Sequence, residues 1–216
     1  DIADINNDGL ADIVAVDMLP RDNSRKKMLM GANNYQTYLN NEQFKHTYQY
    51  TRNTLQLNQG LAPTQSGWHP VFSEISLFSD IAETDWSWAP TLLDFDHDGY
   101  RDLLVTNGFP KDVTDRDFGS FRAESERVAT KSFMLAQIPE VKINNYAFRN
   151  KGDLTFEDVT QKWGLATPSF SNGAAYGDLD NDGDVDYVVN NVNDSAFVYR
   201  NNLVESKAAQ SNYLRI

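Results

Sequence analysis

The sequence predicts an all-β fold of about three four-stranded repeats, interrupted by two partly helical insertions. The first observation is an aspartate-rich motif, D-x-D/N-x-D-G-x-x-D, which occurs at 4–12, 94–102 and 178–186. The second is the short apolar segment that follows each motif. The third is a recurring strand pattern that ends in asparagine. Together they define a repeated unit of four strands, as in the blade of a β-propeller or a comparable stack of sheets.

Each motif has the ligand spacing of a calcium loop, in which side chains at positions 1, 3, 5 and 9 and the carbonyl at position 7 converge on the ion. The predicted metal ligands are Asp4, Asn6, Asp8, Leu10 and Asp12; Asp94, Asp96, Asp98, Tyr100 and Asp102; and Asp178, Asp180, Asp182, Asp184 and Asp186. We expect three structural Ca²⁺ sites, because the motif supplies neither the histidine ligands nor the general base of a catalytic metal. Since Asn6 replaces an aspartate, we expect the first site to be the weakest.

The segments around each motif indicate β-hairpins. An EF-hand would need an acidic residue at position 12 and a helix beyond it, but position 12 is Ala15, Val105 or Val189. Strands are expected after the motifs at 13–16, 103–105 and 187–189, and before the second and third motifs at 89–93 and 173–177.

Two further strands complete the repeat. Alternating apolar residues lead into an asparagine turn at 54–60, 146–152 and 197–202. In the first two repeats another strand follows, at 72–75 and 156–159. The repeats are therefore expected around 4–75, 86–160 and 170–202.

The insertions are expected at 20–52 and 109–145, at the same point of the first two repeats. The first is rich in tyrosine, with a short helix at 24–30, and its tyrosines suit either ligand recognition or packing onto the repeat. The second predicts a helix from about 115 to 137, which Pro139 would end. Insertions at one point of a repeat emerge on one face, often the binding face.

Composition narrows the classes of function. The formal net charge is −12, and twelve aspartates lie in the three motifs, so three bound Ca²⁺ ions would leave about −6. An acidic chain of this kind argues against a nucleic-acid partner. The chain has no cysteine and no window of about 18 apolar residues that could span a membrane. Weak calcium sites fill outside the cell, which favours an exported protein.

With these motifs, the sequence resembles the FG-GAP/VCBS repeat superfamily, the calcium-loop propellers that include the head of integrin α chains. It is more narrowly similar to bacterial VCBS proteins related to cartilage acidic protein, which carry an ASPIC/UnbV module after the propeller. The segments that carry this likeness are 86–90, 171–178 and 212–216. The resemblance implies a propeller segment at 1–202, and a linker with the start of an ASPIC/UnbV-like module at 203–216.

The same resemblance implies a propeller of usually seven blades on a secreted or cell-surface protein, with the remaining blades outside these residues. We expect a non-enzymatic module that binds protein or glycan, or that serves adhesion or scaffolding. The three histidines are far apart in sequence, and no catalytic motif or organic-cofactor motif is recognisable. The alternative is a polysaccharide-acting enzyme with its active site in the insertions or outside these residues.

Overall fold

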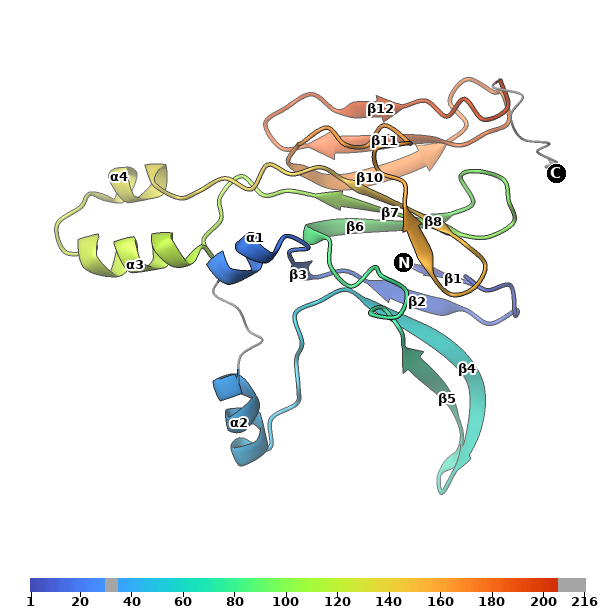
Figure 1. Cartoon of the computed structure of the whole chain (residues 1–216), viewed down its shortest axis with the longest axis horizontal. Helices are drawn as coiled ribbons and strands as arrows, with labels where there is room; N and C mark the ends of the chain where they lie inside the picture. The colour runs from blue at the N-terminus through green and yellow to red at the C-terminus, as the bar shows by residue number, and fades with distance from the viewer. Residues whose placement is uncertain (30–34, 206–216) are drawn as a thin grey trace.

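The computed structural model describes residues 1–29 and 35–205, which form three antiparallel sheets lying one beside the next (Figure 1). The first sheet has the order β1 (Ile2–Ala3), β2 (Asp12–Ala15), β4 (Thr54–Thr64), β5 (Gly67–Glu74). The second is β3 (Met18–Leu19), β6 (Asp85–Leu93), β7 (Asp102–Asn107), β8 (Tyr146–Asn150), β9 (Phe156–Asp158). The third is β10 (Ser171–Gly177), β11 (Asp186–Asn191), β12 (Phe197–Tyr199).

The prediction of an all-β fold is confirmed, and so is the order of strands within a repeat. Each motif joins two antiparallel neighbours: β1 and β2, β6 and β7, or β10 and β11. A third strand then pairs with the second strand of each hairpin. The first two sheets also have the expected outer strand, β5 or β9.

Strand β7 shows how the sheets stack, because all six of its residues are buried. Successive side chains of a strand point to opposite faces. Leu103 and Val105 therefore pack into the core shared with the first sheet, together with Val14. Leu104 packs into the core shared with the third sheet, together with Val189. The second sheet is thus covered on both faces, as a β-propeller blade would be.

Two strands differ from the sequence-based expectation. The asparagine turn expected after Asn58 is instead an irregularity in the register, and β4 continues to Thr64. Gly60, with φ of 79°, allows the strand to bend there and continue, so β4 and β5 form a long hairpin that projects beyond the sheet (Figure 1). The unexpected strand β3 leaves the first repeat and pairs with β6 of the second sheet.

The insertions contain four helices in the described residues: α1 (Asn23–Met28), α2 (Tyr35–Phe44), α3 (Arg116–Ser125) and α4 (Lys131–Ala136). The short helix expected at 24–30 corresponds to α1, while α2 was not expected. The single helix expected from about 115 to 137 is wrong. Thr130 accepts a hydrogen bond from the Phe133 amide and begins a new helix there.

Ion pairs fix the insertions to the second sheet. The Arg25 guanidinium on α1 binds Asp85 at the start of β6, with Nε 2.5 Å from Oδ2, and its Nη1 lies 3.3 Å from Oδ2 of the buried Asp112. Leu29 also forms a β-bridge with Asp115. The two insertions therefore meet at one end of the sheet. The segment expected to open a further module, 212–216, lies outside the described residues.

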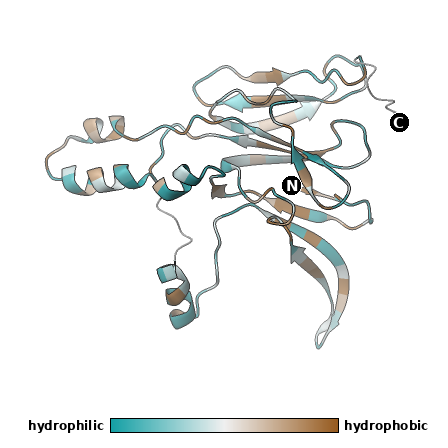
Figure 2. Ribbon diagram, in the orientation of Figure 1, coloured by the Kyte–Doolittle hydropathy of each residue, from teal (hydrophilic) through white to brown (hydrophobic). Residues whose placement is uncertain are grey.

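Hydropathy follows this architecture, with apolar residues along the strands and polar residues in the connecting loops (Figure 2). None of the helices in the described part of the chain combines the length and the apolar character needed to cross a bilayer.

Candidate metal centres

The three aspartate-rich loops, loop 1 (4–12), loop 2 (94–102) and loop 3 (178–186), share a left-handed backbone at two positions. Position 4 is left-handed in each, with φ of 60° at Asn7, 57° at His97 and 62° at Asn181. Position 6 is also left-handed, and it is Gly9, Gly99 or Gly183. Glycine adopts this conformation at no steric cost, so the repeated glycine in the sequence reflects a repeated turn.

Loops 1 and 2 share one hydrogen-bond pattern. In loop 1, Asp4 accepts from the amides of Asp8 and Gly9, at 3.2 and 2.8 Å, and Asp8 accepts from the amide of Leu10 at 2.8 Å. The corresponding three distances in loop 2 are 3.1, 2.9 and 2.9 Å. Each carboxylate is thereby held toward the interior of its own loop.

The aspartate at position 9 has a second role that the motif alone did not reveal. Asp12, Asp102 and Asp186 are buried, and each accepts two backbone N–H groups. In loop 2, Asp102 Oδ2 accepts from Phe95 N and Oδ1 from Asn150 N, both at 3.0 Å. This residue closes the hairpin and attaches it to the third strand of its sheet, whether or not it also contacts an ion.

Some of the predicted ligands converge closely. In loop 2, Asp94, Asp96 and Asp102 each place an oxygen within 4.8 Å of the others, as Asp178, Asp180 and Asp182 do in loop 3. In loop 1, two carboxylates, Asp4 and Asp8, flank the neutral Asn6. Oxygen-only donors at this spacing suit a hard cation such as Ca²⁺.

Two observations are consistent with a cation in the loops at 94–102 and 178–186. Asp178 Oδ1 and Asp184 Oδ1 are buried and accept no hydrogen bond from the part of the chain that the structure describes. A buried carboxylate oxygen without a partner is unfavourable unless a cation compensates it. Burial also raises the pKa of Asp102 to about 7 and raises that of Asp184. A divalent ion beside such groups would favour their charged forms again.

Arginines at the loops were missed in the sequence. Arg149 binds loop 2 through Asp96 (Nε to Oδ2, 2.5 Å) and Asp98 (Nη2 to Oδ2, 2.9 Å). Arg200 likewise pairs with Asp180 of loop 3, at 2.6 Å. Both arginines directly precede the asparagine of the recurring strand pattern, a regular position that does not by itself reveal an ion pair with the loop.

The first repeat has Leu57 at that position. In its loop the Asn6 amide instead donates to Asp8 at 3.0 Å. The positive charge of Arg149 thus offsets the extra carboxylate of loop 2. It reduces the difference in net charge between the first two loops.

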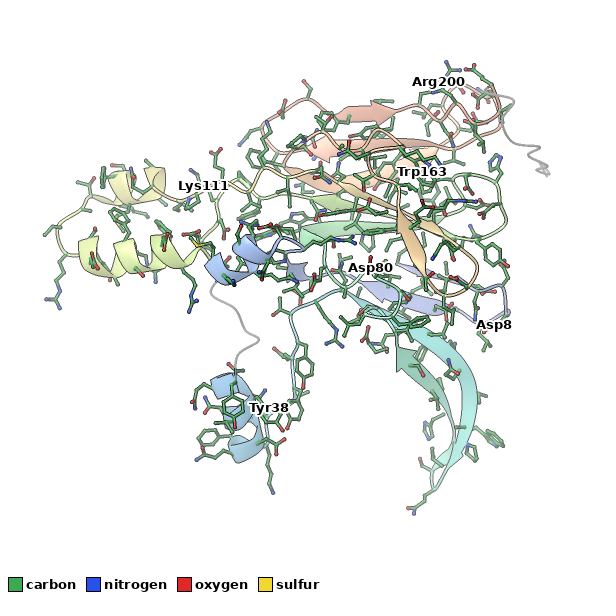
Figure 3. All side chains as sticks on the ribbon, viewed as in Figure 1. Asp8, Tyr38, Asp80, Lys111, Trp163 and Arg200 are labelled. Atoms are coloured by element: carbon green, nitrogen blue, oxygen red, sulfur yellow. The ribbon has the colours of Figure 1, made fainter. Side chains whose placement is uncertain are left out.

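The opposite end of the sheets carries the insertions. Figure 3 shows Asp8 and Arg200 at the loop end, and Lys111 and Tyr38 toward the other. On the first insertion four exposed tyrosines form a continuous row, with ring centroids 6.3 Å apart for Tyr35 and Tyr38, 6.0 Å for Tyr38 and Tyr48, and 6.1 Å for Tyr48 and Tyr50. The Arg52 guanidinium lies 5.5 Å from the last ring. We call these residues the tyrosine row.

Of the two tryptophans before loop 2, one is buried and one lies at the surface. Trp86 is 7% exposed and stacks on Phe109 at 4.7 Å, whereas Trp88 is 42% exposed. Among the histidines, His69 contacts Ser66 Oγ at 2.9 Å on the exposed hairpin of β4 and β5. Within the described residues no carboxylate hydrogen-bonds to His69, so the pair lacks the third member of a nucleophilic triad.

Comparison with known proteins bears on the end of the second repeat and the start of the third. Curated proteins offer no match to this chain. A family model described as FG-GAP-like repeat matches residues 142–189. That stretch runs from the end of the second insertion through β8, β9 and β10 to loop 3 and most of β11. Residues 142–189 are therefore similar to an FG-GAP-like repeat, and this similarity includes the calcium-type loop at 178–186 and the strands on either side of it.

Proposed function

We propose that this chain is a calcium-stabilised β-propeller segment that binds a protein or a glycan at its insertion-bearing end. The observation that carries the proposal is the threefold recurrence of one loop geometry, with buried carboxylate oxygens in the third loop that have no hydrogen-bond partner among residues 1–29 and 35–205. The role of the ions is structural, because the loops close hairpins. Recognition is assigned to the other end of the sheets.

The calcium assignment rests on the donors. All predicted side-chain ligands are oxygen donors, and they lie on a turn whose backbone amides already hold the carboxylates in place. The ligands in each loop are the residues at positions 1, 3, 5, 7 and 9. Bound Ca²⁺ would neutralise the carboxylates and join the two strands of each hairpin. Its binding free energy would then add to the free energy of unfolding.

Recognition at the insertion-bearing end rests on exposed aromatic surface. The tyrosine row presents Tyr35, 74% exposed, and Tyr50, 53% exposed. Tyrosine offers a rigid apolar ring together with a hydroxyl group, which suits both sugar rings and protein side chains. Helix α2, which carries the first two tyrosines, has no buried residue and so packs little against the rest of the described chain.

The wider setting follows from the resemblance to VCBS proteins with an ASPIC/UnbV module. We place the segment in a longer, exported bacterial protein, secreted or at the outer-membrane surface, whose other blades complete a ring. The outer face of the third sheet fits this arrangement, since Val198 is 64% exposed and pairs with Val188 on the neighbouring strand.

Calorimetric titration with CaCl₂ tests the calcium role. We expect binding of about three ions per chain, with dissociation constants of roughly 10⁻⁴ to 10⁻³ M if the sites resemble extracellular modules. The variants Asp94→Ala and Asp178→Ala should each remove about one ion. Absence of calcium-dependent heat, together with a melting temperature unaffected by EDTA, would contradict the proposal.

Binding to a glycan panel tests the insertion-bearing end. The double variant Tyr38→Ala/Tyr48→Ala interrupts the tyrosine row, whereas Tyr176→Ala removes a tyrosine that is 55% exposed on the third sheet. We expect the first to abolish binding and the second to preserve it. Turnover of a glycan, lost on changing one acidic residue outside the loops, would instead favour the polysaccharide-acting enzyme.

A further inference from the structure

One asparagine recurs at the same place in every sheet, four residues after the first residue of the third strand: Asn58, Asn150 and Asn201. In each case the backbone N–H donates to the position-9 aspartate of the loop in the same sheet, at 2.8, 3.0 and 2.9 Å. The side-chain oxygen in turn accepts from the amide two residues later, at 2.9, 2.9 and 3.2 Å. The asparagine is therefore attached to its own calcium-type loop.

In two of the three cases the side-chain amide also reaches the preceding sheet. Asn150 Nδ2 donates at 2.8 Å to the carbonyl of Ile5, which is position 2 of loop 1. Asn201 Nδ2 donates at 2.9 Å to the carbonyl of Phe95, which is position 2 of loop 2. Both bonds join residues more than a hundred positions apart, and Asn150 is 1% exposed. We call these two contacts the inter-sheet bonds.

The inter-sheet bonds complete a path from one loop to the next. The residue at position 2 that receives the bond donates its own N–H to the position-9 aspartate of its loop, as Phe95 does to Asp102 and Ile5 to Asp12. Starting at loop 3, the path runs from Asp186 through Asn201 and Phe95 to loop 2. From Asp102 it continues through Asn150 and Ile5 to loop 1.

We propose that Asn150 and Asn201 are positioning residues that couple neighbouring calcium loops, so that Ca²⁺ bound in one loop raises the affinity of the loop in the adjoining sheet. This inference rests on the proposed calcium-binding function. The position-9 aspartate already accepts the asparagine N–H without an ion, so a cation bound to that aspartate would restrain an existing contact further. The asparagine amide then passes this restraint to position 2 of the preceding loop.

The chain contains its own control. Asn58 makes the same bonds within its sheet, including 3.1 Å from Nδ2 to the Ala11 carbonyl, which matches the bond of Asn150 to the Arg101 carbonyl at 3.0 Å. No sheet precedes the first one in the described residues, so Asn58 makes no inter-sheet bond there. Comparing Asn150→Ala with Asn58→Ala separates the inter-sheet bond from the local role of the asparagine.

The experiment is a Ca²⁺ titration of the whole chain followed by NMR. The amides of Gly9, Gly99 and Gly183 report one loop each, because every loop has a single glycine at position 6. We expect Asn150→Ala to weaken binding at loop 1 by about three- to tenfold, the range for one lost hydrogen bond. It should also remove the dependence of the Gly9 titration on filling of loop 2, whereas Asn58→Ala should leave that dependence intact.

A second measurement does not depend on how the buried Asn150 tolerates substitution. Asp180→Ala disables loop 3 through a partly exposed side chain and should weaken binding reported by Gly99 several-fold through Asn201. Unchanged binding at Gly99, or a Gly9 titration in Asn150→Ala that still depends on filling of loop 2, would overturn the coupling. Calcium binding with independent loops would leave the proposed function intact, whereas no response at any of the three glycines would refute both.

Discussion

The dual role of the position-9 aspartate gives a sharp test of which loop residues hold the hairpin and which hold the ion. Asp186 is 2% exposed, and its oxygens accept from Leu179 N and Asn201 N, both at 2.9 Å. Asp186→Ala leaves two partly buried N–H groups without an acceptor. At about 1–2 kcal/mol each, the loss is about 2–4 kcal/mol of unfolding free energy without calcium. In a domain of this size that lowers Tm by roughly 5–15 °C.

Asp180, at position 3 of the same loop, is the matched comparison. Its side chain is 34% exposed and pairs with Arg200, a surface contact worth about 0–1 kcal/mol. Asp180→Ala should therefore melt close to the parent protein in excess EDTA, but gain less from added CaCl₂. Thermal unfolding followed by circular dichroism, with and without calcium, distinguishes the two. If Asp186→Ala melts like the parent in EDTA, its hydrogen bonds do not hold the hairpin and the reasoning is wrong.

Four further predictions follow from the same contacts. Chelation with EDTA should lower the parent Tm by several degrees, as calcium at 100 times its Kd adds about 2.7 kcal/mol. In a calorimetric titration, loop 1 should fill last, because Asn6 leaves it with fewer carboxylates than the other two loops. If loop 1 fills first, the number of carboxylates does not set the order of affinity. Arg149→Leu copies Leu57 of the first repeat and should tighten calcium binding at loop 2 about tenfold, seen at the Gly99 amide, by removing a positive charge near the ion; unchanged affinity would refute this. Phe148→Ala, in the core between the first two sheets, should cost about 3–5 kcal/mol in chemical denaturation, whereas exposed Phe133→Ala should cost under about 1 kcal/mol.

The local sequence pattern was sufficient to predict the three hairpins and their loops. A glycine at position 6 and an apolar segment after position 9 describe a turn and a strand over nine to twelve residues. These features depend on neighbours in sequence, so one chain reveals them. The burial of β7 on both faces is equally local in origin, because its apolar centre, Leu103 to Val105, suits a strand covered on both sides.

Contacts between segments far apart in the sequence could not be predicted from the local sequence motifs. Nothing near Asn58 shows that β4 continues to Thr64, since its pairing with β5 across the chain decides this. The same holds for Arg149, whose ion pairs with loop 2 span about fifty residues, and for the asparagine amides that reach another sheet. The break between α3 and α4 was readable from Thr130, but the surrounding helix-forming residues concealed it.

The doubly covered β7 has a consequence for how such a chain is assembled. A sheet that is apolar on both faces gains most of its stability from the interfaces on either side, and little from its own strands alone. Stability then grows with the number of contacts between adjacent sheets, in the manner of a one-dimensional chain of nearest neighbours. Duplicating one sheet would add an interface without redesigning any other, whereas deleting the middle one would bring together the faces of Val14 and Val189, which now contact different partners.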